Sequence, residues 1–211
     1  MKYRFLLLAC LIFLTCRQSM TMAAEITNIR PIQLHDGVNT VPHFGTDGSK
    51  ITIVQAWRGN GNAHGHHTWM ILSPNVEGHS FGIVGIDRSD THPLGEILRD
   101  DPFDGERSMG VVHFAKAQVN GRDLSILIEA NLDQESGRAF ADHEPVTIQI
   151  FQLVRTDGAP GTTPEVFRPI VTIREAKRYC NAELALHQVL HIPLPADYAG
   201  PNTVDGCFDP R

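Results

Sequence analysis

The sequence has few cysteines, few basic residues and no long apolar segment beyond its N-terminus. Its four cysteines include no C-x-x-C pair, which disfavours a thiol redox centre or a cysteine-based zinc site. No later stretch approaches the roughly 20 apolar residues that a membrane-spanning helix needs. Only 18 Lys and Arg stand against 24 Asp and Glu. Nucleic acid and anionic membrane surfaces are therefore disfavoured as partners, and no membrane span is expected.

The N-terminal residues have the order of a secretory signal peptide. Two basic residues occur among the first four, an apolar run follows over 5–14, and small residues end the segment near Ala23. We expect cleavage after Ala23, which makes residues 1–23 a signal peptide and the protein periplasmic or secreted. Cys16 follows the apolar run, so lipoprotein processing is the alternative.

Residues 24–211 are then expected to form a single β-rich domain. The signal holds three of the 18 basic residues and no acidic residue, so its removal changes the net charge from −6 to −9. Cys180 and Cys207 are the cysteines left in this exported domain, and we predict that they form a disulfide. Closing the loop between these two cysteines would stabilise the fold by about 3–4 kcal/mol.

Alternating apolar and polar residues dominate the chain from residue 26 onward, a pattern typical of β-strands. Ile26 to Leu34 is expected to be the first strand, and Pro31 places it at a sheet edge or in a bulge. His35-Asp36-Gly37 and Thr46-Asp47-Gly48 have the composition of turns. Further strands are expected over residues 51–58, 68–72, 81–86, 146–154 and 167–171.

The dipeptide Asn120-Gly121 predicts a two-residue hairpin turn between strands at 109–119 and 122–132. Asn and Gly supply the two positive φ angles of a type I′ turn. The turn would pair residues whose numbers sum to about 241, a register in which His113 and Glu129 point to opposite faces. These two side chains are therefore not expected to form an acid–base pair.

One helix is expected near the C-terminus. Thr172 and Glu175 have the spacing of a capping box, which predicts a helix from there to about Leu190. No βαβ alternation occurs, so a doubly wound sheet is disfavoured. The sequence predicts a mainly β protein, an antiparallel β-sandwich or partly closed barrel of about seven or eight short strands with one C-terminal helix.

The densest group of metal-ligand residues is His64-Gly65-His66-His67, between the apolar runs of Ile51 to Leu72. If the chain is extended, His64 and His66 face the same side, and His67 could join them in binding zinc or copper. A catalytic zinc site needs about three protein ligands. The missing ligands could come from His79, Asp87, His113 or Glu129. The alternative is a solvated polar loop.

Three other patterns are weaker. Gly59, His64 and His66 are similar to the start of the first cupin motif, but Met70 and Ile71 stand where its glutamate is expected. Residues 78–82 match the G-x-S-x-G nucleophile elbow, yet a strand is expected after Ser80, so we expect an ordinary turn. The acidic group of the long loop does not fit an EF-hand, and we expect it to be solvated: Asp100, Asp101, Asp104 and Glu106.

No motif is complete enough to name a reaction. The main hypothesis is an exported protein that binds a protein, glycan or small-molecule ligand without catalysis. The alternative is a metal-binding protein or metalloenzyme that uses His64, His66 and His67 with zinc or copper. A further alternative is an inhibitor or immunity protein of the cell envelope, for which the acidic charge favours a basic partner.

Overall fold

The strands lie in two sheets. The computed structural model describes residues 24–59, 61, 65–75, 80–88, 94–101, 108–133, 143–157 and 163–194. The first sheet has the order β1 (Ile26–Pro31), β8 (Gly110–Val119), β9 (Arg122–Leu132), β10 (Glu144–Arg155), β11 (Glu165–Tyr179) and β6 (Gly85–Ile86). The second has the order β2 (Gly37–Val41), β3 (Ile51–Arg58), β4 (His66–Pro74) and β5 (Phe81–Ile83), and β7 (Ile97–Arg99) also pairs with β4.

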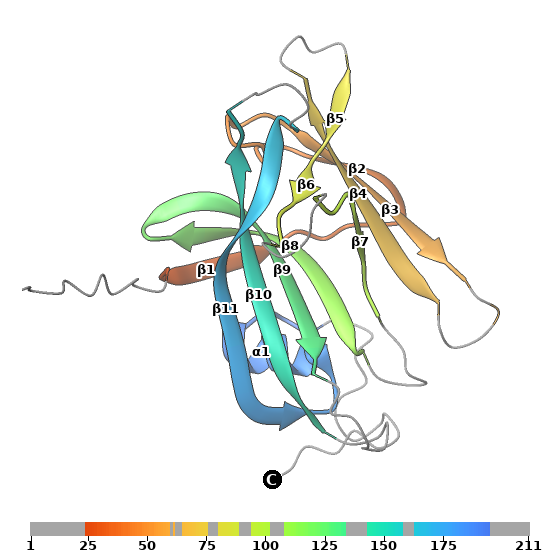
Figure 1. Ribbon diagram of the computed structural model, residues 1–211, viewed down its shortest axis with the longest axis vertical. Coiled ribbons are helices and arrows are strands. Elements are labelled where there is room, and N and C mark those ends of the chain that lie inside the picture. Colours follow the sequence, from red (N-terminus) through yellow and green to blue (C-terminus); the bar gives the residue numbers. More distant parts are fainter. Residues whose placement is uncertain are drawn as a thin grey trace, which may run out of the picture.

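The two sheets and one helix confirm the predicted mainly β fold class. The sheets are not closed into a barrel. Their strands pair antiparallel, apart from the short parallel pairing of β6 with β11. In the view of Figure 1 the second sheet lies toward the upper right, and helix α1 (Ala182–Leu190) lies near the lower ends of β9 to β11. In the described chain, no helix is long and apolar enough to cross a membrane.

The hairpin β8–β9 forms with the predicted turn and register. Asn120 and Gly121 have φ angles of 50° and 76°, as a type I′ turn requires. Val119 pairs with Arg122 and Val112 with Glu129. His113 and Glu129 are consequently on opposite faces, as the sequence predicted.

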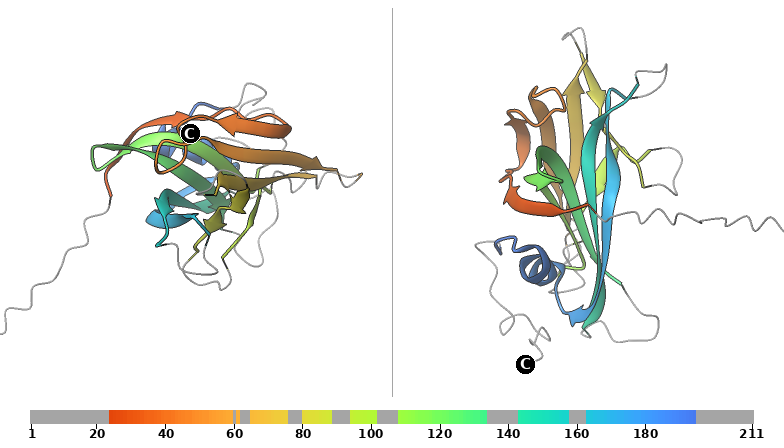
Figure 2. Two further views of the ribbon diagram at one scale, coloured as in Figure 1. Left: turned by 90° about the horizontal axis from the view of Figure 1, so that it is seen from above. Right: turned by 90° about the vertical axis from the view of Figure 1, so that its left-hand side faces the viewer.

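The two faces of the central strands contribute to two different hydrophobic cores. On one face, Ile126 and Ile128 of β9 pack with α1 in a helix-side core. On the other, Leu127 of β9 packs with Ile53 and Trp69 of the second sheet in a sheet-side core. Figure 2 (right) shows α1 beside one end of the long strands and β2 and β3 toward the other end.

Strand β10 contributes to both cores, and a β-bulge in its neighbour β11 lies at the point where they meet. Ile150 pairs with Val171 whereas the next residue, Phe151, pairs with Pro169, so the register shifts at this point. Both side chains are fully buried, Ile150 in the helix-side core and Phe151 in the sheet-side core. Alternation along β10 places these neighbouring side chains on opposite faces, and the extra residue of the bulge is Ile170 of β11.

The predicted start of the helix is wrong. Thr172 pairs with Gln149, and β11 continues to Tyr179, so the capping-box spacing at Thr172 and Glu175 lies within a strand. The hydrogen-bonded ladder to β10 outweighs this local helix signal, which is a weak prior. The helix begins after Asn181, whose side chain accepts a hydrogen bond from the Glu183 amide at 2.8 Å, and it ends at Leu190 as expected.

The first strand agrees with the sequence in the residues that the structure describes. β1 is an edge strand with a register shift between Thr27 and Arg30, in line with the expectation from Pro31. Cys180 is buried beside the N-terminus of α1. Its predicted partner Cys207 lies outside the described residues, so the disulfide stays a prediction.

Candidate functional site

The hairpin β3–β4 carries the histidine-rich segment. Arg58 pairs with His66 and Thr52 with Leu72, so Ile51 to Leu72 is the strand-loop-strand unit that the sequence predicted. Trp69 and Ile71 face the sheet-side core, and alternation places His67 on that same inner face and His66 on the outer face. His66 and His67 therefore cannot direct their side chains toward one cation from a shared face.

Asp100 fixes the orientation of the His67 ring. One carboxylate oxygen of Asp100 accepts the His67 backbone N–H at 2.7 Å, and the other lies 2.9 Å from His67 Nδ1. The Asp100 amide in turn donates to the His67 carbonyl at 3.3 Å. Because an ionised carboxylate only accepts hydrogen bonds, Nδ1 carries a proton, and in the neutral form of the ring Nε2 then has the lone pair.

The other side of the His67 ring faces Asp36. The distance from His67 Nε2 to Asp36 Oδ1 is 4.0 Å. Gln55 joins this side chain to the core, since its Nε2 donates to Asp36 Oδ1 at 3.1 Å and its Oε1 accepts from Trp69 Nε1 at 2.8 Å. Asn39 holds the preceding turn by hydrogen bonds to the backbone N–H and C=O of His35. Asp36 is therefore placed by a network, although its side chain is 60% exposed.

Two tryptophans flank the histidine, and they are the two tryptophans of the whole chain. The ring centroids of Trp57 and Trp69 lie 4.8 Å and 5.7 Å from that of His67. Trp57 packs on the backbone of Gly65, where an added Cβ would lie 2.2 Å from Trp57 Cζ2. Gly65 is thus required for the position of this ring, a different role from the metal loop that the sequence indicated.

Asp100 also departs from the expectation of a solvated acidic loop. Its side chain is 13% exposed. Burial raises the pKa of Asp100 above its ordinary value, because the charged form loses hydration, and the hydrogen bonds from His67 oppose this shift. Asp101 is exposed, and Asp104 and Glu106 lie outside the described residues.

The other candidate ligands are not gathered around His66 and His67. His113 lies 3.0 Å from a carboxylate oxygen of Glu183 on α1, and Glu129 pairs with Arg88. Asp87 faces Arg168 at 4.0 Å. In the described part of the chain, no group of three or more His, Cys, Asp or Glu side chains could hold a metal ion.

Two sequence patterns remain to be placed. His64 and His79 lie outside the described residues, so a metal site built on His64 and His66 stays a prediction. Ser80 directly precedes β5, and its hydroxyl accepts a hydrogen bond from Asn75 Nδ2 at 2.6 Å. The G-x-S-x-G residues thus lead into a strand, without the strand-to-helix turn of a nucleophile elbow.

A cavity of about 440 Å³ opens next to this network, at the seam between the two sheets. One wall is Gln55 and Trp69 of the second sheet, and another is β8 where β1 no longer pairs with it. The chain between β1 and β2 and the residues after α1 complete the lining: Pro31, Ile32, Gln33, Leu34, Gln55, Trp69, Val112, His113, Phe114, Ile192, Pro193 and Leu194.

Sequence reasoning named His67 but missed the residues around it. Asp36 was read as a turn residue and Asp100 as part of a solvated loop. The turn signal at Asp36 was correct, but nothing local shows that this turn faces residue 67. Alternation in β3 and β4 was the usable signal, because it places Trp57, His67 and Trp69 on the inner face.

Comparisons with known proteins give a fold and no function. No family model matches the sequence, and no curated protein matches it. The structure is similar to the crystal structure of CarG, with a TM-score of 0.61 and 18% sequence identity over 76% of this chain and 95% of that chain. At this identity the likeness shows a shared fold alone.

Proposed function

We propose that this protein is an exported binding protein without catalytic activity, and that a small, mainly apolar ligand occupies the cavity between the two sheets. The cavity is the observation that carries the proposal. Its volume of about 440 Å³ is within the range of roughly 300–1,000 Å³ that is usual for ligand sites. Eight of its twelve lining residues are apolar, and the polar ones are Gln33, Gln55, Trp69 and His113.

The backbone of β8 adds hydrogen-bonding groups to this cavity. The Phe114 carbonyl accepts from the Ile32 amide at 2.8 Å, so Phe114 directs its carbonyl away from β9. Alternate residues of a strand direct their N–H and C=O to the same side, so those of Val112 also point to this side. A ligand with one polar group and an apolar body suits such a lining.

The absence of catalysis is supported by the surroundings of His67. The pair Asp100–His67 has the arrangement of an acid–base dyad, in which a carboxylate orients an imidazole. Its Nε2, however, faces the carboxylate of Asp36 at 4.0 Å. Among the described residues, no serine, threonine or cysteine side chain is hydrogen-bonded to His67, so the histidine activates none of them as a nucleophile.

Filling the cavity tests the proposal. The probe is 1-anilinonaphthalene-8-sulfonate, an apolar fluorophore with one polar group, and the variant is Val112→Phe. The control is Val54→Phe, a change of the same size on the outer face of the second sheet, where Val54 pairs with Met70. We expect one saturable site that is at least about tenfold weaker in Val112→Phe and unchanged in the control. Equal binding by all three proteins would contradict the proposal.

A further inference from the structure

The group of His67, Asp36 and Trp57 is a second candidate site, separate from the residues that line the cavity. Two hydrogen-bond acceptors face each other here, the lone pair of His67 Nε2 and the carboxylate of Asp36, 4.0 Å apart. A nitrogen donor forms hydrogen bonds of about 2.8 Å to such acceptors. One N–H-bearing group therefore fits between them and contacts both.

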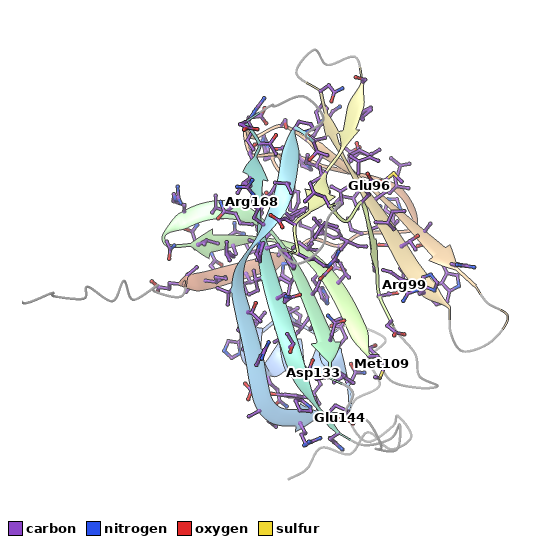
Figure 3. All side chains as sticks on the ribbon, viewed as in Figure 1. Glu96, Arg99, Met109, Asp133, Glu144 and Arg168 are labelled. Carbon is purple, nitrogen blue, oxygen red and sulfur yellow. The ribbon has the colours of Figure 1, made fainter. Side chains whose placement is uncertain are left out.

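The charge of this group favours a cation. Asp36 and Asp100 are carboxylates on two sides of the ring, and in the tautomer that Asp100 selects the neutral ring accepts at Nε2. The nearest arginines along the strands, Arg58 and Arg99, occupy outer-face positions, because Arg58 pairs with His66 and Arg99 with Thr68. Figure 3 shows Arg99 near the end of β7, toward the end of the β3–β4 hairpin where its two strands are connected. No described lysine or arginine side chain forms an ion pair with Asp36.

The aromatic rings provide the second element of a cation site. Trp57 is 46% exposed although it lies on the inner face of β3, and its ring is 4.8 Å from that of His67. Tryptophan is the side chain whose ring face attracts cations best. Gly65 leaves room for this ring, so the exposed indole lies against Gly65 and beside His67.

We propose that His67, Asp36 and Trp57 bind an alkylammonium or guanidinium group, the chemistry of a lysine or arginine side chain. In the bound state the cation donates to His67 Nε2 and Asp36 Oδ1 and contacts the Trp57 indole. Asp100 is a positioning residue, because it holds the Nδ1–H tautomer that makes Nε2 an acceptor. This inference concerns a site other than the cavity, and it does not depend on whether the cavity binds a ligand.

Tryptophan fluorescence reads this site directly, because both tryptophans of the chain flank His67. The first probe is N-acetylarginine amide, and its matched control is N-acetylcitrulline amide, which has the same shape without the charge. The expected result is a saturable change with the arginine compound and none with the citrulline compound. An equal response to both compounds would overturn the proposal.

Two aspartate variants locate the effect. Asp36→Asn removes one charge and keeps the shape, and we expect binding to weaken by about tenfold. Asp133→Asn is the control, since Asp133 lies just after β9, at the lower end of this strand in Figure 3, and accepts a hydrogen bond from Thr147. Undiminished binding in Asp36→Asn would overturn the proposal. Circular dichroism checks that both variants fold. If Asp36→Asn does not fold, Trp57→Phe is the second variant, and Trp69 then reports binding.

The source of the cation is distinguished by a second arm with an arginine-rich peptide and its citrulline counterpart. Saturation by the free amino acid amide indicates a small cationic ligand. Saturation by the peptide alone indicates a basic side chain on a protein partner, as an envelope inhibitor would require. No response in either arm overturns the proposal. Because Val112→Phe leaves these residues in place, failure of this site and failure of the cavity are separable.

Discussion

The hairpins β8–β9 and β3–β4 follow the same pairing rules and differ in what fills their inner positions near the connection. In β8–β9, small apolar residues such as Ala117 and Val119 are buried right up to the turn. In β3–β4, the last inner positions are Trp57 and His67, both partly exposed. Next to its turn, the first hairpin has buried core residues. The second hairpin has a polar and aromatic group at the corresponding positions.

This difference separates residues that stabilise the fold from residues that are available for binding. A buried aliphatic side chain contributes about 1.5–3 kcal/mol through its removal from water. A half-exposed histidine held by carboxylates contributes less to folding, and it offers directed hydrogen-bonding groups. Substitutions in the two hairpins should therefore affect different measurements.

The largest effect is expected in the β8–β9 hairpin. Ile128 is fully buried in the helix-side core, and Ile128→Ala should lower the free energy of unfolding by about 2–5 kcal/mol. Urea unfolding measures this change, with Val38→Ala as the control because Val38 is 65% exposed. At urea concentrations at which Ile128→Ala is folded, it should still bind N-acetylarginine amide. Similar losses in both variants would contradict the assignment of the core.

The next effect is expected at Gly65 in the β3–β4 hairpin. Its added Cβ in Gly65→Ala would overlap Trp57, which has to move, so we expect a cost of about 1–3 kcal/mol together with loss of arginine amide binding. Gly59→Ala is the matched control, because its Cβ would lie 3.6 Å from Trp57 Nε1, an ordinary contact. If binding is lost equally in both, the ring position is not what matters.

A smaller effect is expected at the turn of β8–β9. Gly121 has a φ of 76° and open space around its Cα, so Gly121→Ala should cost about 1 kcal/mol through backbone strain alone. The measurement is the shift of the urea midpoint at constant slope. Asn120→Gly at the neighbouring turn position keeps the positive φ but loses the hydrogen bond that Asn120 Oδ1 accepts from the Glu25 amide at 3.0 Å, so its cost measures this bond and not backbone strain. Arginine amide binding should be the same in all three proteins.

The smallest effect concerns Asp100 and pH. Because burial raises the pKa of Asp100 in the folded state, the folded protein holds this proton more tightly than the unfolded chain. Its contribution to stability is present below the ordinary carboxyl pKa and is lost as the pH rises through the raised folded value. Relative to Asp100→Asn, the unmodified protein should therefore lose stability as the pH rises from below the ordinary carboxyl pKa through the raised folded value. If the unmodified protein instead gains stability relative to Asp100→Asn as the pH rises, the raised pKa of Asp100 is refuted.

The sequence predicted the β8–β9 hairpin closely because its signals are local. Asn120-Gly121 sets both turn and register, and the alternation on either side agrees with them. The start of the helix was wrong because the signal at Thr172 is equally local, whereas the pairing of β11 with β10 depends on residues more than 20 positions away. Local signals thus succeed where no distant strand competes for the same backbone.

The candidate site could be predicted only in part. His67 stood out by its neighbours in the sequence, but Asp36 and Asp100 are each more than 30 residues away from it. They meet His67 because the turn before β2 and the strand β7 both lie against the β3–β4 hairpin. No turn residue fixes that arrangement, so the sequence alone could not reveal it.

Strands of the first sheet supply residues to both cores, which predicts that the two cores unfold together. β8, β9 and β10 each direct one face to α1 and the other to the second sheet, as Ile128 and Leu127 do in β9. Unfolding of the strands that form one core would therefore also remove strands from the other core. A fragment with only one core would expose the apolar strand faces that normally form the second. We therefore expect a single unfolding transition despite two separate cores, because non-local pairing must form before either is complete.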